Sequence, residues 1–248
     1  MKLPLTAIIL THRADSTFLQ ALQSVQDCAE VLVYDNTSQN NWDQLHTQYS
    51  FTVKKIAAGQ ITNFAAIRNK ALKTASQDWV FFLDSDEVLQ PFDPKKVRSL
   101  LENNSAGYTI TRSDIFLGRQ LHHGEAGNQK IIRLMKRDFA HFEHAIHEVA
   151  IIDGQTSDSS LKVHHFSHTS ITQFMRDITI YAKEIARTRT PFTTSILVEL
   201  ILYPPIKFLY TFFFLFGFLD GYRGLVYSCM MSLHSLLVRI YTYEQTTT

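Results

Sequence analysis

Two aspartates separated by one serine, Asp84 and Asp86, are the residues whose type and spacing point most directly to chemistry. They follow residues 79–83, an apolar run that is typical of a buried strand. In an extended turn both carboxylates can reach one hard cation, and Mg²⁺ usually takes one or two carboxylates together with substrate phosphates. Asp-Ser-Asp is also ordinary turn composition. Its position directly after an apolar strand favours a site for a divalent metal, Mg²⁺ or Mn²⁺.

Arg68 and Glu148 are candidates for the other steps of a transfer reaction. Arg68 lies in a helical pattern ahead of the acidic pair, and its planar guanidinium could hold a diphosphate. Glu148 follows a histidine-rich stretch and could take the proton of an attacking hydroxyl. The alternative for Glu148 is an ion pair with an arginine such as Arg133. Other acids of the middle region could also be the base: Asp114, Glu125, Asp138 and Glu143.

The histidines give a weaker signal. One of the neighbours His164 and His165 could be a third metal ligand or contact a phosphate, with His165 the candidate ligand. Both could equally be histidines satisfied within the fold. The remaining histidines of the middle region have no spacing that indicates a zinc site: His122, His123, His141 and His144.

The acidic pair also allows a second enzymatic interpretation. Phosphatases of the haloacid dehalogenase type place an Asp-x-Asp after an apolar strand and use the first aspartate as nucleophile. Such an enzyme needs a later acidic pair for its metal, and no Gly-Asp-x-x-x-Asp follows in this sequence. The metal-site interpretation without a covalent intermediate is therefore preferred.

Alternating strand and helix patterns position these residues. Ser16 and Asn63 are expected to cap the two helices between the strands. The order of strand, helix, strand, strand, helix and strand predicts an open α/β sheet with crossover helices. The predicted strands cover residues 5–10, 30–34, 51–56 and 79–83.

Ligands of such sheets bind beyond the carboxyl ends of the strands. Thr11, Asp35 and Asp84 all fall at those ends. The sequence therefore predicts that these three side chains meet at one edge of the sheet, where a bound substrate would lie.

Composition limits the classes of function. The 248 residues are 45% hydrophobic and 19% charged, which predicts a folded protein. A formal net charge of +1 gives no basic field for nucleic acid. The two cysteines have no metal-like spacing and suit a reducing compartment. The apolar run near the N-terminus stops at Thr11 without a cleavage site, so a strand is the better interpretation than a signal peptide.

The composition changes after Pro191. Residues 170–188 predict an amphipathic helix, whereas residues 195–219 are almost wholly apolar and aromatic. Pro204 and Pro205 are expected to interrupt that stretch, which argues against a membrane-spanning helix. We expect a catalytic domain over residues 1–190 and an apolar helical tail over residues 191–248 that contacts a membrane at the interface or as a re-entrant segment. The alternative is a buried pair of core helices.

The motifs in this order resemble those of family-2 inverting glycosyltransferases, closest to the lipopolysaccharide-core β-1,4-glucosyltransferase subgroup. The resemblance is carried first by residues 6–11 (TAIILT), 33–36 (VYDN), 67–72 (IRNKAL) and 79–87 (WVFFLDSDE). It continues through residues 133–134 (RL), 146–148 (IHE), 161–167 (LKVHHFS), 217–221 (GFLDG) and 224–225 (GL). No single motif is specific, but the ordered set covers nearly the whole chain.

The resemblance implies a three-layer α/β domain of the GT-A type and assigns roles to the candidate residues. Asp35 would bind the nucleotide base, with Thr11 beside it, and Arg68 would support the nucleotide. Asp84 would lie near the ribose and the metal, and Asp86 would be the main metal ligand. Glu148 would be the general base.

The implied reaction is inverting transfer of a hexose from a UDP-linked nucleotide sugar to a glycan or glycolipid acceptor in bacterial envelope polysaccharide synthesis. The protein would work as a peripheral or monotopic protein at the cytoplasmic face of the inner membrane, with no nucleic acid partner. A hypothesis from another class is a non-catalytic, sugar-nucleotide-binding membrane scaffold. The presence of all the acids together argues against that scaffold.

Overall fold

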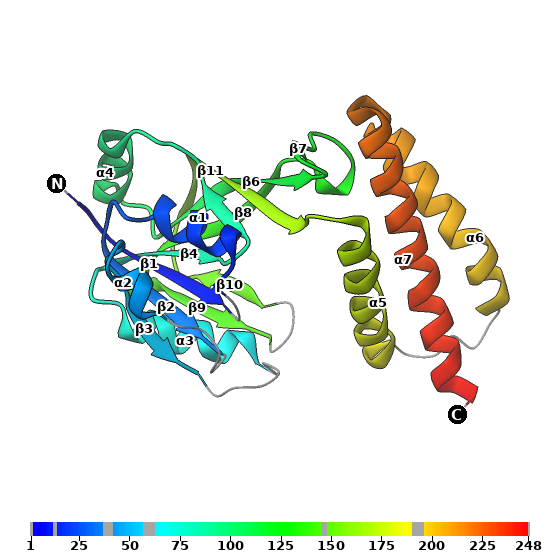
Figure 1. The fold of residues 1–248 in the computed structure, drawn as a ribbon, viewed down its shortest axis with the longest axis horizontal. Coiled ribbons are helices and arrows are strands. Elements are labelled where there is room, and N and C mark those ends of the chain that lie inside the picture. Colours follow the sequence, from blue (N-terminus) through cyan, green and yellow to red (C-terminus); the bar gives the residue numbers. More distant parts are fainter. Residues whose placement is uncertain are drawn as a thin grey trace. The chain divides into compact units, whose positions relative to one another are not determined.

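The structure is a computed structural model that describes residues 2–11, 14–36, 42–56, 63–144, 148–189 and 196–247. The chain divides into two compact units, which are described separately (Figure 1). Unit 1 comprises Met1–Arg112 and Lys130–His165, and unit 2 comprises Ser113–Gln129 and Phe166–Thr248.

A mixed β-sheet forms the centre of unit 1. Its strands run in the order β3-β2-β1-β4-β8-β6-β11-β5, and the first four are parallel to one another. Strand β8 is antiparallel to β4, and β5 is antiparallel to β11. The four strands predicted from the sequence are β1 (Leu3–Thr11), β2 (Cys28–Asp35), β3 (Thr52–Lys55) and β4 (Trp79–Asp84). The predicted open α/β sheet is confirmed.

The remaining strands follow β4 in the chain. They are β5 (Glu87–Leu89), β6 (Gly107–Phe116), β7 (Arg119–Gln120), β8 (Gln129–Lys136) and β11 (Thr156–His168). Strand β7 pairs with the end of β6 in unit 2. A separate antiparallel pair consists of β9 (Ala140–Glu143) and β10 (Val149–Ile152).

Helices cover both faces of the sheet. They are α1 (Ser16–Ser24), α2 (Asp43–His46), α3 (Phe64–Thr74) and α4 (Pro94–Glu102). Ile9 of β1 belongs to the same buried cluster as Phe18 of α1, whereas the next residue back, Ile8, clusters with Leu72 of α3. Alternate residues of a strand point to opposite faces, so β1 is buried on both sides in a three-layer arrangement.

Of the two predicted N-cap residues, Asn63 is confirmed and Ser16 is not. The side chain of Asn63 accepts the backbone N–H of Ala66, which confirms it as the cap of α3. At α1 the cap is Asp15, whose carboxylate accepts the N–H groups of Thr17 and Phe18. Ser16 is instead the first helical residue. The prediction of Ser16 was therefore wrong by one position, because a carboxylate one residue earlier reaches the free N–H groups.

Unit 2 is largely helical. Its main helices are α5 (Ile171–Thr188), α6 (Ile196–Leu209) and α7 (Gly221–Thr247), with a π-helical turn η3 (Tyr210–Phe214) and a 3₁₀ turn η4 (Gly217–Asp220) after α6. A second 3₁₀ turn, η1, covers Gly124–Ala126. Helix α7 contacts both α5 and α6. Phe174 and Ile178 on the apolar face of α5 share a buried cluster with Met230 of α7.

The proline pair does not interrupt the apolar segment, contrary to the expectation. Helix α6 continues through Pro204 and Pro205, and the hydroxyl of Ser232 in α7 donates to the carbonyl oxygen of Pro204 at 2.6 Å. The chain turns later, at Phe216, whose φ of 58° is left-handed. The two prolines lack backbone N–H groups and so leave the carbonyl oxygens of Leu200 and Ile201 without their usual helical donors, yet the chain bends only later, where the backbone conformation changes at Phe216.

Length and composition decide whether the apolar helices of unit 2 could cross a membrane. No single helix among the residues described is long and apolar enough to cross a bilayer. Residues Val198–Phe214 and Gly217–Gln245 pass the test of length and composition only as a pair, with a bend of 72° between them.

Both cysteines are free thiols. Cys28, at the start of β2, is 2% exposed, and burial raises the pKa of its thiol to about 12. Cys229 lies on α7 and is exposed.

Candidate functional site

The carboxyl ends of the parallel strands bring the predicted residues to one edge of the sheet. Thr11 of β1 pairs in register with Asp35 of β2, and Leu10 of β1 pairs with Asp84 of β4. Neighbouring strands lie roughly 4.8 Å apart, so the three positions are adjacent. The three positions lie at one edge of the sheet as predicted. The side chain of Asp84, level with Leu10, points to the opposite face from those of Thr11 and Asp35, because alternate residues of a strand face opposite sides.

Two arginines hold the carboxylate of Asp84. Arg68 Nη2 donates to Oδ1 at 2.8 Å, and Arg133 Nη2, from β8, donates to Oδ2 at 2.5 Å. Burial raises the pKa of Asp84, but the charges of Arg133 and Arg68 and their hydrogen bonds outweigh it and hold the pKa well below its ordinary value. Asp84 is therefore a carboxylate fixed in orientation from two sides.

Arg68 connects Asp84 to Glu148. The side chain is 5% exposed, and its Nε donates to Glu148 Oε1 at 2.8 Å. The guanidinium carbon lies 5.3 Å from the ring centre of Phe82 and 5.6 Å from that of Phe142. Glu148 thus does form an ion pair, as its alternative interpretation required, but with Arg68 and not with Arg133.

Glu87 is a site residue that sequence reasoning missed. Its side chain is fully buried, and Oε2 accepts the backbone N–H of Asp84 at 3.1 Å. Its other oxygen accepts from Arg133 Nη2 at 2.9 Å and lies 3.8 Å from Arg112 Nη1. The signal for Glu87 was its position directly after the acidic pair. Arg112 and Arg133 come from β6 and β8, and no sequence spacing places them here.

Asp86 lies beside one of the two neighbouring histidines. Asp86 Oδ2 is 3.5 Å from His165 Nε2, because β5 pairs with β11 in the register that sets His165 opposite Glu87. Within the described ranges, no three or more carboxylate, imidazole or thiol groups form a ready-made metal cluster. Asp86 and His165 are the two groups of the predicted metal site that the fold brings together.

Asp35 is buried at the far side of the same edge. Its Oδ2 accepts from Trp42 Nε1 at 2.9 Å and from Lys55 Nζ at 2.5 Å. The carbonyl oxygen of Thr11 accepts the N–H of Asn36 at 3.2 Å. This arrangement fixes the rotamer of Asp35 and adds Lys55 and Trp42 to the neighbourhood of the predicted nucleotide-binding residues.

A pocket of about 380 Å³ lies over the arginines. Asp84 and Glu148 are the acids among its lining residues. Of the other candidate bases, Glu143 and Asp138 are mostly exposed and pair with His141 and Arg137. Asp114 and Glu125 belong to unit 2. The pocket lining consists of Arg68, Asp84, Arg112, Ile131, Ile132, Arg133, Phe142, Glu148, Val149 and Ala150.

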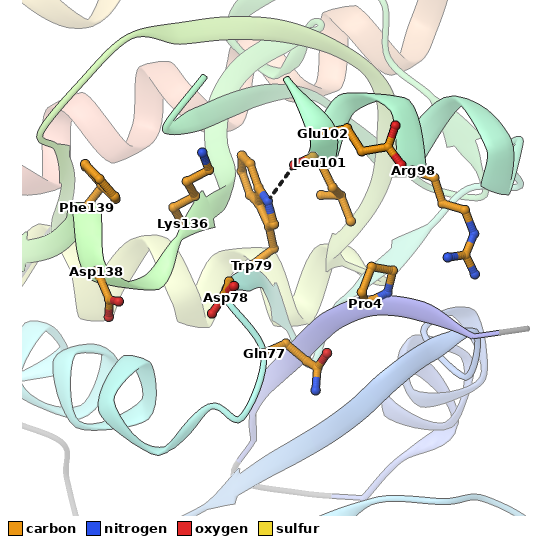
Figure 2. Close-up of a pocket in the computed structure, with 10 residues that line it drawn as sticks. All are labelled: Pro4, Gln77, Asp78, Trp79, Arg98, Leu101, Glu102, Lys136, Asp138 and Phe139. Atoms are coloured by element: carbon orange, nitrogen blue, oxygen red, sulfur yellow. Dashed lines mark hydrogen bonds between the residues drawn. The ribbon is translucent and has the colours of Figure 1, made fainter. Parts of the chain in front are cut away.

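A larger pocket, of about 560 Å³, opens at the opposite ends of the strands (Figure 2). Pro4 near the start of β1 and Trp79 at the start of β4 line it, and Trp79 Nε1 donates to the carbonyl oxygen of Leu101. Lys136 Nζ lies 5.4 Å from the Trp79 ring centre. Of the predicted site residues only Asp138, an alternative candidate for the base, lines this pocket, so volume alone does not identify the site.

Comparison with known proteins identifies the family. The sequence model described as "Glycosyl transferase family 2" matches residues 6–146, more than half of the chain. The chain belongs to glycosyltransferase family 2. This range contains all the predicted site residues except Glu148 and His165.

One curated relative extends the similarity over most of the protein. The family-2 chain is 23% identical over 256 residues to "Lipopolysaccharide core biosynthesis glycosyltransferase LpsC" of Rhizobium meliloti (strain 1021), covering 92% of this chain and 90% of the relative. The predicted family is confirmed, and the name of this relative agrees with the lipopolysaccharide-related subgroup that the resemblance indicated.

Solved structures share the fold. Mannosyltransferase PcManGT from Pyrobaculum calidifontis, in complex with GDP-Man and Mn²⁺, has a TM-score of 0.54 at 11% identity, covering 99% of this chain and 88% of that one. S. aureus TarS is also similar, at a TM-score of 0.46 and 16% identity, over 88% of this chain and 45% of that one. The similarity to PcManGT and the strand order show that the family-2 chain has an α/β fold of the GT-A type with a mixed central sheet.

Family membership decides between the two enzymatic interpretations of Asp84 and Asp86. The family-2 protein is a glycosyltransferase, not a phosphatase of the haloacid dehalogenase type. The prediction of an enzyme is confirmed.

Proposed function

We propose that this glycosyltransferase moves a hexose from a UDP-linked nucleotide sugar to a glycan or glycolipid acceptor, with inversion, in the synthesis of bacterial envelope polysaccharide. The observation that carries the proposal is the pocket in which Arg68 joins Asp84 to Glu148. It combines a cation for a diphosphate with a carboxylate for a hydroxyl proton. The name of the relative LpsC supports lipopolysaccharide as the polymer.

The donor is proposed to bind along the carboxyl ends of β1, β2 and β4. Asp35 and Thr11 would contact the base, Asp84 the ribose, and Arg68 the diphosphate. The fixed rotamers of Asp35 and Asp84 support this, because preorganised polar groups bind a ligand at a lower entropic cost. Structural neighbours were solved with nucleotide sugars: PcManGT with GDP-Man and the TarS fragment 1–349 with UDP-GlcNAc.

A divalent ion fits beside Asp86. A separation of 3.5 Å between Asp86 Oδ2 and His165 Nε2 suits two neighbouring ligands of one ion. Mg²⁺-type sites usually take few protein ligands and complete their shell with water and substrate phosphates. Asp86 and His165, with Asp84 at the other end of the turn, would hold the ion, which neutralises charge on a leaving diphosphate.

Glu148 is the proposed general base. An inverting transfer is a single displacement, in which the acceptor oxygen bonds to the anomeric carbon as the bond to the diphosphate breaks. The hydroxyl proton passes to the Glu148 carboxylate. Arg68, hydrogen-bonded to Glu148, keeps that carboxylate oriented until the substrates bind.

We also propose that the protein works at the cytoplasmic face of the inner membrane, where nucleotide sugars are made and a lipid-linked acceptor is accessible. The tail predicted from residue 191 would provide the attachment. Within unit 2 it is packed through α7 against α5.

The test is a screen of nucleotide sugars for binding and for hydrolysis or transfer by the full chain, with and without Mn²⁺ or Mg²⁺. A UDP-sugar should stabilise the protein only with the ion present, and Asp86→Asn should abolish that effect while the protein stays folded. Activity that persists in excess chelator would contradict the metal site. Metal-dependent binding without turnover on any acceptor would favour the scaffold hypothesis instead.

A further inference from the structure

The surface formed by α6, the bend and the start of α7 carries no exposed charge. Between residues 198 and 229, every exposed residue is apolar, aromatic, glycine, proline or cysteine. Phe214 is 74% exposed and Ile201 69%. We call this surface the lipid face; its large exposed side chains are Val198, Ile201, Leu202, Tyr203, Ile206, Leu209, Tyr210, Phe213, Phe214, Phe216, Phe218, Leu219, Tyr222 and Leu225.

The charged residues of α6, Glu199 and Lys207, are only partly exposed, and both are paired within unit 2. Glu199 accepts from Arg189 Nη2 at 3.0 Å and lies 3.4 Å from Arg239 Nε. Lys207 donates to Glu125 of the η1 turn. Helices that face water normally show the reverse pattern, with apolar groups inside and charged groups outside.

The charges at the bend are satisfied in the same way. The carboxylate of Asp220, whose side chain is 7% exposed, accepts the backbone N–H groups of His122 and His123. Arg223 Nε donates to the carbonyl oxygen of Leu117 at 3.3 Å. Glu199, Lys207 and Asp220 therefore each accept or donate a hydrogen bond with a partner in unit 2, and Arg223 donates to a backbone carbonyl there.

Helix α5 supplies the contrast within the same unit. Its exposed residues include Arg176, Lys183 and Arg187, among apolar ones such as Met175 and Ile180. The charge-free surface is thus a property of the lipid face and not of unit 2 as a whole.

We propose that the lipid face lies in the hydrocarbon boundary of a phospholipid membrane, with α6 parallel to the membrane plane. Uncharged acyl chains complement a surface without charge, and contiguous apolar patches of this extent mark an interaction surface. A parallel orientation follows from the bend, because His122 and Asn128, in the loop held by Asp220, are exposed polar residues that require water. Residues 198–214 would lie along the surface for about 25 Å.

This inference deepens the proposed membrane location and does not depend on the chemistry of the pocket. The test is flotation of the full chain with vesicles of phosphatidylethanolamine and phosphatidylglycerol. The variant Ile201→Lys with Phe214→Lys places two charges in the lipid face. Its matched control, Met175→Lys with Ile180→Lys, adds the same charge to exposed apolar positions of α5. All four side chains are exposed, so both variants should fold.

Wild type and control should float, and the lipid-face variant should lose at least about tenfold in its partition coefficient. Equal flotation of all three proteins, or an equal loss in both variants, would overturn the proposal. The proposal would also be overturned if the protein formed a dimer without lipid and only the lipid-face variant lost it. A second copy of the chain would then cover this face. Sugar transfer to a soluble acceptor in detergent distinguishes failure of the membrane proposal from failure of the proposed function. The lipid-face variant should retain this transfer activity. If the proposed function is wrong, wild type will lack the activity as well.

Discussion

Arg68 binds both the donor-side carboxylate and the proposed general base. One guanidinium binds the carboxylate at the donor side, Asp84, and the proposed base, Glu148, at 2.8 Å each. A donor diphosphate that engages Arg68 competes with Glu148 for the same cation. Binding of the donor is therefore expected to loosen the pair and make Glu148 available to the acceptor.

Glu148→Gln keeps the shape of the side chain and removes the base. We expect the transfer rate to fall by roughly 10²–10⁴-fold, the usual range for loss of general-base catalysis. Donor binding, measured by calorimetry, should survive and be at least as tight as in wild type, because the Glu148 carboxylate no longer competes for Arg68. Glu143→Gln is the matched control, because Glu143 is exposed and lies outside the pocket lining. Wild-type turnover by the Glu148 variant would show that the base is another group.

Glu87→Gln tests a positioning role. The buried carboxylate orients the N–H of Asp84 and the guanidinium of Arg133, so its loss should disturb the turn that carries Asp86. Groups that orient metal ligands typically contribute 10–100-fold in metal affinity or activity. We expect Mn²⁺ binding, followed by electron paramagnetic resonance, to weaken within this range.

The control for this variant is Glu102→Gln, at an exposed position of α4. A purely structural role for Glu87 would lower the melting temperature and leave the Mn²⁺ affinity of the folded fraction unchanged. That result would contradict the positioning role.

At this scale the sequence predicted the acids better than their partners. Thr11, Asp35 and Asp84 were found because parallel strands end at a common edge, which strand order alone implies. The contacts of Arg133 and Arg112 depend on antiparallel strands that return after long connections, and their pairing leaves no periodic signal. For Glu148 the alternative to a general base was an ion pair with an arginine such as Arg133, and the distance from Arg68 in sequence gave no reason to join those two.

At the scale of elements, one loop fixes the bend between α6 and α7. The loop before η1 donates two backbone N–H groups to Asp220, and Gly124 N–H donates to the carbonyl oxygen of Leu215 at 2.8 Å. Phe216 adopts a left-handed conformation there. The loop thus holds a backbone geometry that a phenylalanine adopts only with support.

Asp220→Ala should loosen this element without unfolding the sheet of unit 1. Two N–H groups lose a charged acceptor, and a hydrogen bond to a charged group contributes about 1.5–3 kcal/mol. Hydrogen exchange at His122 and His123 should accelerate by roughly tenfold or more. Asp220→Asn, which keeps one acceptor oxygen, should show a smaller effect. Unchanged exchange in the alanine variant would mean that Asp220 does not hold the loop.

Helix α6 shows why element boundaries were the weaker part of the sequence interpretation. Two prolines predict a break, but α6 continues through both and packs against α7, which is distant in sequence. Helix α6 ends at Leu209, a residue type that does not predict the end of a helix. The same packing affects truncation, because a chain ending near Thr190 would expose Phe174 and Ile178 of α5. Surface substitutions are therefore the cleaner test of membrane contact.

At the scale of the whole molecule, stability should depend on acid pH through Asp84. The charges of the two arginines keep its pKa in the folded protein below that of the unfolded chain, so the folded protein binds fewer protons. The stabilisation is complete above about pH 4 and is lost as the pH falls below that value toward the folded pKa. In urea unfolding, the free energy of unfolding of the wild type should therefore fall markedly between pH 5 and pH 3. This pH range is set roughly by the ordinary carboxyl pKa.

Asp158→Asn is the control for this effect. A hydrogen bond from Thr109 and the charge of Lys130 also lower the pKa of Asp158, but its side chain is 70% exposed and solvent screens it. Asp158→Asn should keep the acid sensitivity of wild type, and Asp84→Asn should flatten it. An acid profile that is the same in all three proteins would show that the arginine pair around Asp84 does not govern it.

The two cysteines differ in exposure, so a thiol-reactive dye should label only one of them. Maleimides react with thiolates, and a thiol with a pKa of about 12 forms almost none at neutral pH, so Cys28 should remain unmodified in the folded protein. Cys229 is exposed on α7, one helical turn beyond Leu225 of the lipid face. A solvatochromic dye attached there would report the local polarity through its emission wavelength. The natural sequence thus already carries a one-site optical probe of unit 2.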